Sequence, residues 1–89
     1  MAWTVEIADV AEKQLKKLDP QVRQRILDWL GDRIEGCKNP RHFGEALKGG
    51  HVGLWRYRVG DYRILCDIQD GRLCVLALAV GHRREIYRR

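Results

Sequence analysis

The sequence predicts an α+β fold in which an N-terminal strand and a helical hairpin pack on a small, mainly antiparallel sheet, in the order β-α-α-β-β-β. Three observations lead to this prediction. Residues 3–7 alternate apolar and polar side chains, residues 9–34 repeat apolar side chains at helical spacing, and residues 54–80 hold strand-like runs separated by two tight-turn signals. Because 89 residues without an internal repeat suit one domain, we expect a single domain over residues 1–89.

The N-terminal part is expected to form one strand and two helices. Residues 3–7 read as a half-buried strand, and Asp9 followed by Glu12 resembles a capping box that begins a short helix. Asp19 as N-cap and Pro20 at the first helical position predict the start of a second helix. The apolar stripe of that helix consists of Val22, Ile26, Trp29, Leu30 and Ile34, and Gly36 ends it. The two helices should therefore pack as a hairpin on one face of the sheet.

Residues 37–53 show neither a strand period nor a helical period. The Asn39-Pro40 step and the glycines at positions 44, 49, 50 and 53 predict a loop. Phe43 and Leu47 are expected to anchor this loop to the core.

The first hairpin signal is Gly60-Asp61, which fits a two-residue type II′ turn and fixes the register of the flanking strands. Arg58 is then expected opposite Arg63. The face expected in the core comprises Trp55, Tyr57, Val59, Tyr62, Ile64, Cys66 and Ile68, and the other face carries Arg56, Arg58 and Arg63. Since like charges facing each other destabilise a strand pair, this cationic face calls for an anionic partner.

The second hairpin signal is Asp70-Gly71, which fits a type I′ turn and returns the chain along residues 73–80. That run is apolar on both faces, as in an interior strand. A two-residue turn would set Arg63 opposite Leu78. The basic tail, residues 81–89, should thus reach the same end of the sheet as Arg58 and Arg63.

The composition narrows the class of partner. Seventeen Lys and Arg against twelve Asp and Glu give a net charge of +5, which favours nucleic acid or an acidic protein. Three cysteines without Cys-x-x-Cys spacing and three dispersed histidines predict no disulfide framework, no metal site and no cofactor. The chain shows no signal peptide or membrane-spanning run, so we expect a cytoplasmic protein with no membrane partner.

Three stretches together resemble the RelE-type toxins of bacterial and archaeal toxin–antitoxin pairs. They are Leu47-Lys48-Gly49, LWRYRVGDYRIL at residues 54–65, and VGHRREIY at residues 80–87, and the resemblance extends over essentially the whole chain. It implies a RelE-like fold and an mRNA interferase, which is a ribosome-dependent endoribonuclease that cuts mRNA in the A site and so inhibits translation. It also implies a cognate antitoxin as partner, for which we expect an acidic, helical binding segment.

The implied reaction is attack of a ribose 2′-OH on the adjacent phosphate, without metal, and the resemblance assigns residues to it. Arg63 and Arg83 match two arginines that hold phosphate charge and stabilise or protonate the leaving group. Tyr87 matches a tyrosine that stacks on a base and positions it. Arg56 and Arg58 stand where the best-known member has lysines, so they are expected to bind RNA and to take part in catalysis.

This substitution leaves the general base open, because a guanidinium with a pKa above about 12 does not accept a proton. We expect His82 to be the base, since imidazole titrates near neutral pH, with Glu85 as the second choice. Arg84 is expected to contact RNA.

Two other functions fit the same residues. One is a non-enzymatic toxin of the ParE kind, which resembles the same fold and inhibits DNA gyrase. The other is a catalytically decayed module that binds RNA without cutting it.

Overall fold

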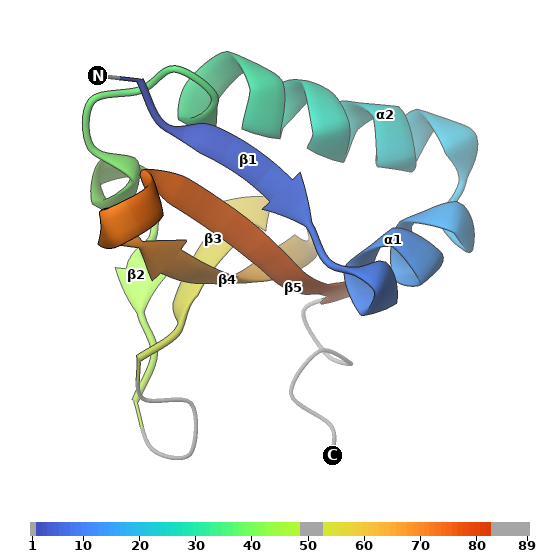
Figure 1. The fold of residues 1–89 in the computed structure, drawn as a ribbon. Helices are drawn as coiled ribbons and strands as arrows, with labels where there is room; N and C mark the ends of the chain where they lie inside the picture. Colours follow the sequence, from blue (N-terminus) through green and yellow to red (C-terminus); the bar gives the residue numbers. More distant parts are fainter. Residues whose placement is uncertain (1, 49–52, 83–89) are drawn as a thin grey trace.

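The computed structural model describes residues 2–48 and 53–82, and within these residues the chain forms a five-stranded sheet with two α-helices on one face (Figure 1). The strands are β1 (Thr4–Ile7), β2 (Glu45–Ala46), β3 (Trp55–Val59), β4 (Tyr62–Gln69) and β5 (Cys74–His82). The helices are α1 (Asp9–Lys16) and α2 (Pro20–Trp29), the latter continued by the π-helical turn η1 (Leu30–Ile34). Short 3-10 turns are η2 (Pro40–Phe43) and η4 (Asp70–Arg72).

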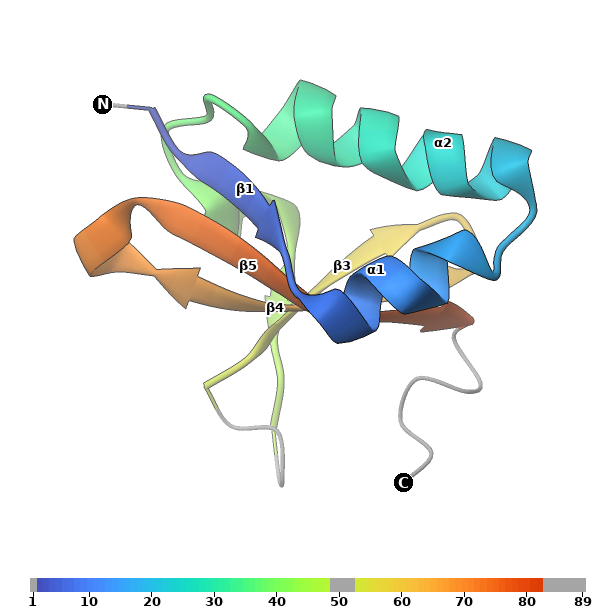
Figure 2. The same ribbon diagram turned by 45° about the vertical axis from the view of Figure 1, so that its right-hand side comes forward.

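The strand order is β1-β5-β4-β3-β2, with β1 parallel to β5 and antiparallel pairing at the other three contacts. This confirms the α+β prediction, and it adds the short strand β2 at one edge. Both helices cover the same face of the sheet, as the second view shows (Figure 2). The core between the layers includes Trp3, Ala11, Leu15, Ile26, Leu30, Ile34, Tyr57, Val59, Ile64, Cys66, Ile68, Val75, Ala77 and Val80.

The two helix starts differ from each other. Asp19 caps α2 as predicted, since its side chain accepts a hydrogen bond of 2.9 Å from the backbone N–H of Gln21. The capping box predicted at Asp9 and Glu12 is wrong: the N-cap of α1 is Ala8, which makes no side-chain cap, and Asp9 is already inside the helix. The acids at 9 and 12 still stand in the first turn, where negative charge suits the helix dipole.

The first hairpin has the predicted register, with Arg58 opposite Arg63 and Val59 opposite Tyr62. Gly60 has a φ of 60°, while Asp61 keeps a negative φ, which is the combination that a type II′ turn requires.

The second hairpin departs from its prediction. Gln69 pairs with Cys74, so the turn is a four-residue connection through η4 in which Leu73 adopts the left-handed conformation with φ 49°. A register shift between Leu65 and Cys66 adds to the displacement. Arg63 consequently lies opposite Gly81, and the predicted pairing with Leu78 is wrong.

Residues 37–48 are more ordered than the predicted loop. The segment forms η2 and β2, and β2 pairs with β3 through Glu45 opposite Arg56. Phe43 anchors the segment only in part: its ring meets the Trp29 ring edge to face at 6.5 Å between centroids, but 40% of its surface is exposed. Pro40 is the fully buried residue instead, and Leu47 is half-buried. A proline side chain loses no rotamer freedom on burial, which suits this role.

Candidate functional site

The cationic face of the sheet lies on the side away from the helices. Alternation along β3 and β4 puts Arg56, Arg58 and Arg63 on this face, because Tyr57 and Ile64 between them are buried in the core beneath α2. Arg58 is exposed, whereas Arg56 and Arg63 are partly buried. The hairpin register therefore assembles the predicted arginines as one cluster.

Glu45 supplies the anion that the arginine cluster requires. It lies directly opposite Arg56 across the β2–β3 pair, and its Oε2 accepts a hydrogen bond from Arg56 Nη2 and lies 3.5 Å from Arg58 Nη2. The hydrogen bond from Arg56, then the charges of Arg58 and Arg63, hold the pKa of the Glu45 carboxyl below its usual range. Glu45 is thus an ionised carboxylate at neutral pH, surrounded by guanidiniums.

A hollow of about 220 Å³ opens next to this carboxylate. Its lining consists of His42, Phe43, Gly44, Glu45, Arg56 and Arg58. It combines two cations, a carboxylate, an imidazole and an exposed aromatic ring, which are the groups that bind and cleave a phosphodiester.

The segment that carries Glu45 lies tightly against β3. A Cβ on Gly44 would stand 2.6 Å from the carbonyl oxygen of Arg56 and 2.7 Å from the Tyr57 ring, so this close approach requires glycine. The buried Tyr57 hydroxyl donates a hydrogen bond of 2.8 Å to the carbonyl oxygen of Pro40. Burial also raises the pKa of Tyr57, which keeps its hydroxyl protonated as a donor.

His82 lies apart from the arginine cluster. It ends β5 directly opposite Tyr62, and the two rings meet edge to face at 5.7 Å between centroids. Residues directly opposite each other share a face, so His82 is on the helical side of the sheet and Arg63 is on the other side.

Four predicted site residues, Arg83, Arg84, Glu85 and Tyr87, lie outside the described residues. Residue 82 ends β5 beside the β3–β4 turn, so the chain leaves the described part at the end of the sheet where Arg58 and Arg63 lie.

Neither a metal cluster nor a membrane helix is found in the described ranges. Among residues 2–48 and 53–82, no group of three or more His, Cys, Asp and Glu side chains is arranged to hold a metal ion. None of the helices in those ranges is both long and apolar enough to span a bilayer.

Sequence reasoning missed Glu45 and His42 as site residues. A two-residue strand has no periodicity that a sequence window detects. The available signal was the excess positive charge on the hairpin, which indicated that an anion should lie nearby. In the structure that anion is Glu45, on the neighbouring segment.

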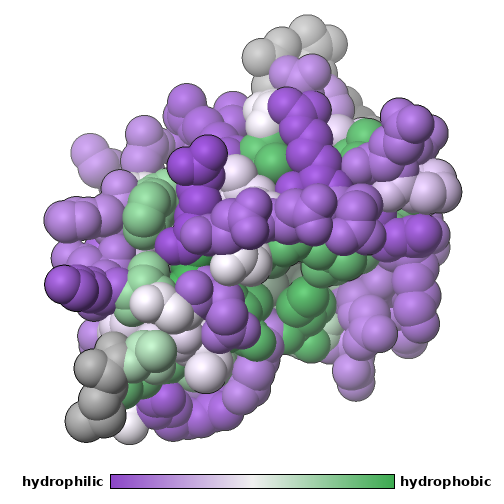
Figure 3. Space-filling view, turned by 90° about the horizontal axis from the view of Figure 1, so that it is seen from above, coloured by the Kyte–Doolittle hydropathy of each residue, from purple (hydrophilic) through white to green (hydrophobic). Residues whose placement is uncertain are grey.

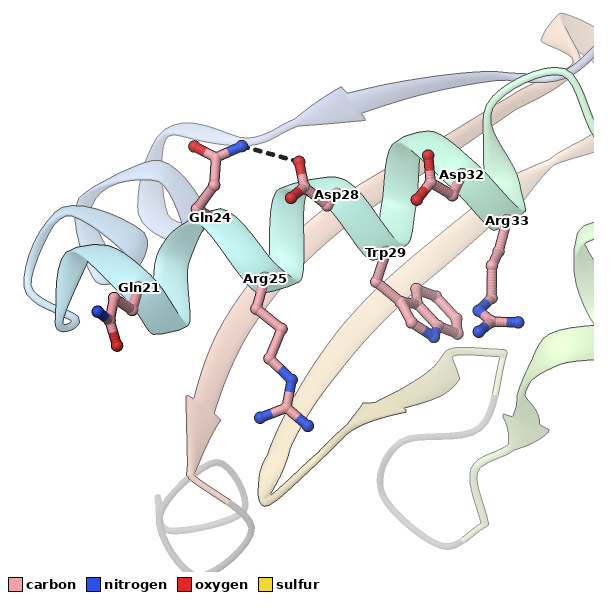
Figure 4. A pocket seen from close by; sticks show the side chains of 7 residues that line it. All are labelled: Gln21, Gln24, Arg25, Asp28, Trp29, Asp32 and Arg33. Carbon is pink, nitrogen blue, oxygen red and sulfur yellow. Dashed lines mark hydrogen bonds between the residues drawn. The ribbon is translucent and has the colours of Figure 1, made fainter.

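Two further surface grooves lie on the helical side. One, of about 510 Å³, follows α2, where Arg25, Trp29 and Arg33 point toward the β3–β4 hairpin (Figure 4). The other, of about 470 Å³, is apolar at Ile7, Leu15 and Leu27 and is flanked by Glu12, Lys16 and Arg23. Seen from above, apolar side chains on this side lie in a hollow between rows of hydrophilic ones (Figure 3).

Comparisons with known proteins agree on one group of relatives. The family model described as the ParE toxin of type II toxin-antitoxin system, parDE, matches residues 5–87. The curated Toxin RelG of Mycobacterium tuberculosis is 33% identical over 90 residues, covering 100% of both chains. Toxin RelE of the same organism is 27% identical over 86 residues, covering 97% of this chain and 87% of that protein.

Solved structures show the same fold. The toxin-antitoxin complex RelBE2 from Mycobacterium tuberculosis contains a chain that superposes with a TM-score of 0.82 at 30% identity, covering 93% of this chain and 100% of that one. The isolated Escherichia coli RelE toxin superposes with a TM-score of 0.72 at 22% identity, covering 91% of this chain and 84% of that one. At that identity the second match establishes the fold alone.

Proposed function

This chain belongs to the RelE/ParE superfamily of toxins from toxin–antitoxin pairs, as a RelE-type toxin, and on this premise we propose that it is an mRNA interferase. It cuts mRNA in the ribosomal A site by attack of a ribose 2′-OH on the adjacent phosphate. The products are a 2′,3′-cyclic phosphate and a 5′-OH. The observation that carries this proposal is the hollow in which Glu45 faces Arg56 and Arg58.

The arginines stabilise the phosphate. As the 2′ oxygen bonds to phosphorus and the bond to the 5′ oxygen breaks, negative charge grows on the pentacoordinate phosphate. Arg58 and Arg63 lie opposite each other and direct two fixed cations at this charge. A guanidinium suits this role because its donors match two phosphate oxygens at once.

Glu45 is the base that the geometry favours. It is the carboxylate inside the hollow, and its lowered pKa keeps it ionised and able to accept the 2′ proton throughout the neutral range. A low pKa makes it a weaker base, and burial of the hollow by bound RNA would raise that pKa. His82 remains the second choice, from the helical side of the sheet. As the resemblance implies, Arg83 acts at the leaving group and Tyr87 stacks on a nucleobase of the mRNA. Arg84 adds a contact to RNA.

The test is primer extension on a defined mRNA in programmed ribosomes. Wild-type protein should cut within the A-site codon, and an Arg63→Ala, Tyr87→Ala double variant should not. Glu45→Gln should slow single-turnover cleavage by about 10²–10⁴-fold if Glu45 is the base. His82→Gln serves as the matched comparison and should retain cleavage. A faster Glu45→Gln enzyme would show instead that this carboxylate only competes with phosphate for the arginines.

Gyrase inhibition is the second candidate function, because the matching family model is that of ParE. It is also favoured because Arg56 and Arg58 stand where the best-known RelE-type toxin has lysines. It predicts growth arrest and loss of DNA supercoiling without any mRNA cut. A decayed RNA-binding module predicts RNA binding that falls steeply with salt, without cleavage.

The antitoxin partner is also part of the proposal. Related structures are described as complexes of a RelE toxin with a RelB antitoxin, which supports a cognate antitoxin for this chain. The apolar groove at Ile7, Leu15 and Leu27 suits the apolar face of a helix, and Lys16 and Arg23 at its rim suit acidic residues on that helix.

A further inference from the structure

The short strand that carries Glu45 has little pairing of its own. β2 forms the pairs Glu45–Arg56 and Ala46–Trp55 with β3, and a hydrogen bond of 3.0 Å from the Leu47 N–H to the Leu54 carbonyl oxygen follows it. Strands of this length contribute few ladder hydrogen bonds, so the position of the carboxylate also depends on how the preceding turn η2 is fixed. Within η2, Arg41 makes the contacts that reach furthest along the chain.

Arg41 joins η2 to the turn between β4 and β5. Its Nη1 lies 2.9 Å from Asp70 Oδ1 and its Nη2 lies 2.7 Å from Asp70 Oδ2, so the pair is bidentate. The same guanidinium lies over the Trp55 ring, with 5.7 Å from Cζ to the ring centroid. The backbone N–H of Arg41 donates to the Asn39 side chain at 3.0 Å, which fixes the start of η2. We call Arg41, Asp70 and Trp55 the Arg41 clasp.

We propose that Arg41 is a positioning residue. The clasp fixes η2 and β2, and these elements in turn place the Glu45 carboxylate and the His42 ring beside Arg56 and Arg58. This inference rests on the proposed function, because it gives the clasp a role in placing the base. Arg41 is not among the residues that line the hollow; it acts through the backbone between residues 41 and 45.

Exposure argues for placement over stability as the role of the clasp. The side chains of Arg41 and Asp70 are 37% and 64% exposed, and ion pairs so open to water contribute little to folding. A bidentate pair stacked on an aromatic ring nevertheless fixes both the distance and the orientation of the guanidinium. A lysine provides one point charge and no fork, so it would not reproduce this geometry.

The pKa of the Glu45 carboxyl depends on where this side chain lies, so it can be used to measure its position. The charged and titratable groups that face it in the described structure are Arg56 and Arg58 on β3, Arg63 on β4, and His42 on η2. The arginines lower the pKa of the Glu45 carboxyl only while that carboxyl stays within reach. If the clasp opens and β2 shifts, the pKa of Glu45 rises toward its ordinary value of about 4.3.

The decisive experiment is a carboxyl ¹³C NMR titration of Glu45 in the full chain, compared among wild type, Arg41→Gln and Asp70→Ala. Arg72→Gln is the matched control, because Arg72 belongs to the same turn and pairs with Glu6 on β1 at 2.7 Å, away from η2. Both clasp variants should raise the midpoint of Glu45, and the control should leave it unchanged. Arg41→Lys should behave like Arg41→Gln.

Single-turnover RNA cleavage provides the second readout. Misplacement of a reacting group by about 1 Å costs up to about 10²-fold in rate, so each clasp variant should cleave on the order of 10-fold more slowly at unchanged thermal stability. Titration curves of both clasp variants that superpose on the wild-type curve would overturn the proposal. If the wild type itself cuts no RNA, the proposed function fails, and the titration still decides whether the clasp places Glu45.

Discussion

Arg58 and Arg63 lie directly opposite each other across β3 and β4, so two guanidiniums of like charge share one face of the hairpin. Such a pair destabilises the strands by roughly 0.2–1 kcal/mol. Glu45 offsets part of this repulsion through its contact with Arg58. The pair therefore disfavours folding, which agrees with the proposed role of the two arginines in holding phosphate.

The first prediction follows from this conflict. Arg58→Gln should leave the free energy of unfolding unchanged or slightly raised, and it should weaken binding of a single-stranded RNA that carries a 2′-deoxy group at the cut site. Loss of one phosphate contact should reduce the slope of log affinity against log salt by about 0.7. Urea unfolding and fluorescence anisotropy at several salt concentrations measure the two effects. Arg72→Gln is the control, and an equal change of slope in that variant would contradict a specific role for Arg58.

The second prediction concerns Gly44. Gly44→Ala should destabilise the protein by about 1–3 kcal/mol, because the new methyl group would overlap the carbonyl of Arg56 and the ring of Tyr57. Gly31→Ala is the matched control, since a Cβ there meets nothing within 4 Å in the π-helical turn; it should stabilise by about 0.4–1 kcal/mol. Chemical denaturation gives both values. Equal stability of the two variants would contradict the close approach of residue 44 to β3.

The third prediction compares how much Asp19 and Asp9, at the starts of the two helices, contribute to stability. Asp19→Ala should cost about 1 kcal/mol by removing the cap on the Gln21 N–H, whereas Asp19→Asn should keep the cap and most of the stability. Asp9→Ala removes no cap hydrogen bond and should cost only a few tenths of a kcal/mol through the helix dipole. Thermal unfolding of the three variants measures the order. A larger loss at Asp9 than at Asp19 would contradict it.

The fourth prediction is a pH dependence that Tyr57 produces. Burial raises the pKa of its hydroxyl in the folded protein, whereas the unfolded chain ionises it near about pH 10. Above that pH the unfolded state binds fewer protons than the folded state, so the free energy of unfolding falls as pH rises. Tyr57→Phe should flatten this alkaline decline in urea titrations from about pH 9 upward.

The Tyr57→Phe comparison also separates the effect of this hydroxyl from that of the thiols. Burial raises the pKa of Cys66, Cys74 and Cys37 as well, and these thiols contribute a decline of the same sign in both proteins. The prediction would be contradicted if the free energy of unfolding declined identically at alkaline pH in Tyr57→Phe and in wild type.

The sequence predicted the first hairpin well because its determinants are local. A Gly-Asp step at residues 60 and 61 fixes a two-residue turn, and the turn fixes the register that brings Arg58 opposite Arg63. The prediction of the second hairpin was wrong because Leu73 takes a left-handed conformation, which leucine rarely adopts. A register shift within β4 and β5 also leaves no mark in an apolar run.

The candidate site was predictable only in its cations. Arg56 and Arg58 follow from strand alternation, whereas Glu45 and His42 reach the site through a segment whose placement depends on tertiary contacts. Those contacts include the Tyr57–Pro40 hydrogen bond and the Arg41–Asp70 pair, which join residues 17 and 29 positions apart. Long-range pairs of this kind have no local sequence pattern.

The parallel pairing of β1 with β5 determines when the sheet can be completed during synthesis of the chain. β1 is made before both helices, and the residues that it pairs with, 74–77, are made some 70 residues after it. Until then, β1 has a helical hairpin beside it and no strand to bond with, and the contact must close a very long loop. The nascent chain therefore remains an incomplete sheet until its last described strand emerges, and a fully assembled toxin exists only when translation of that strand has ended.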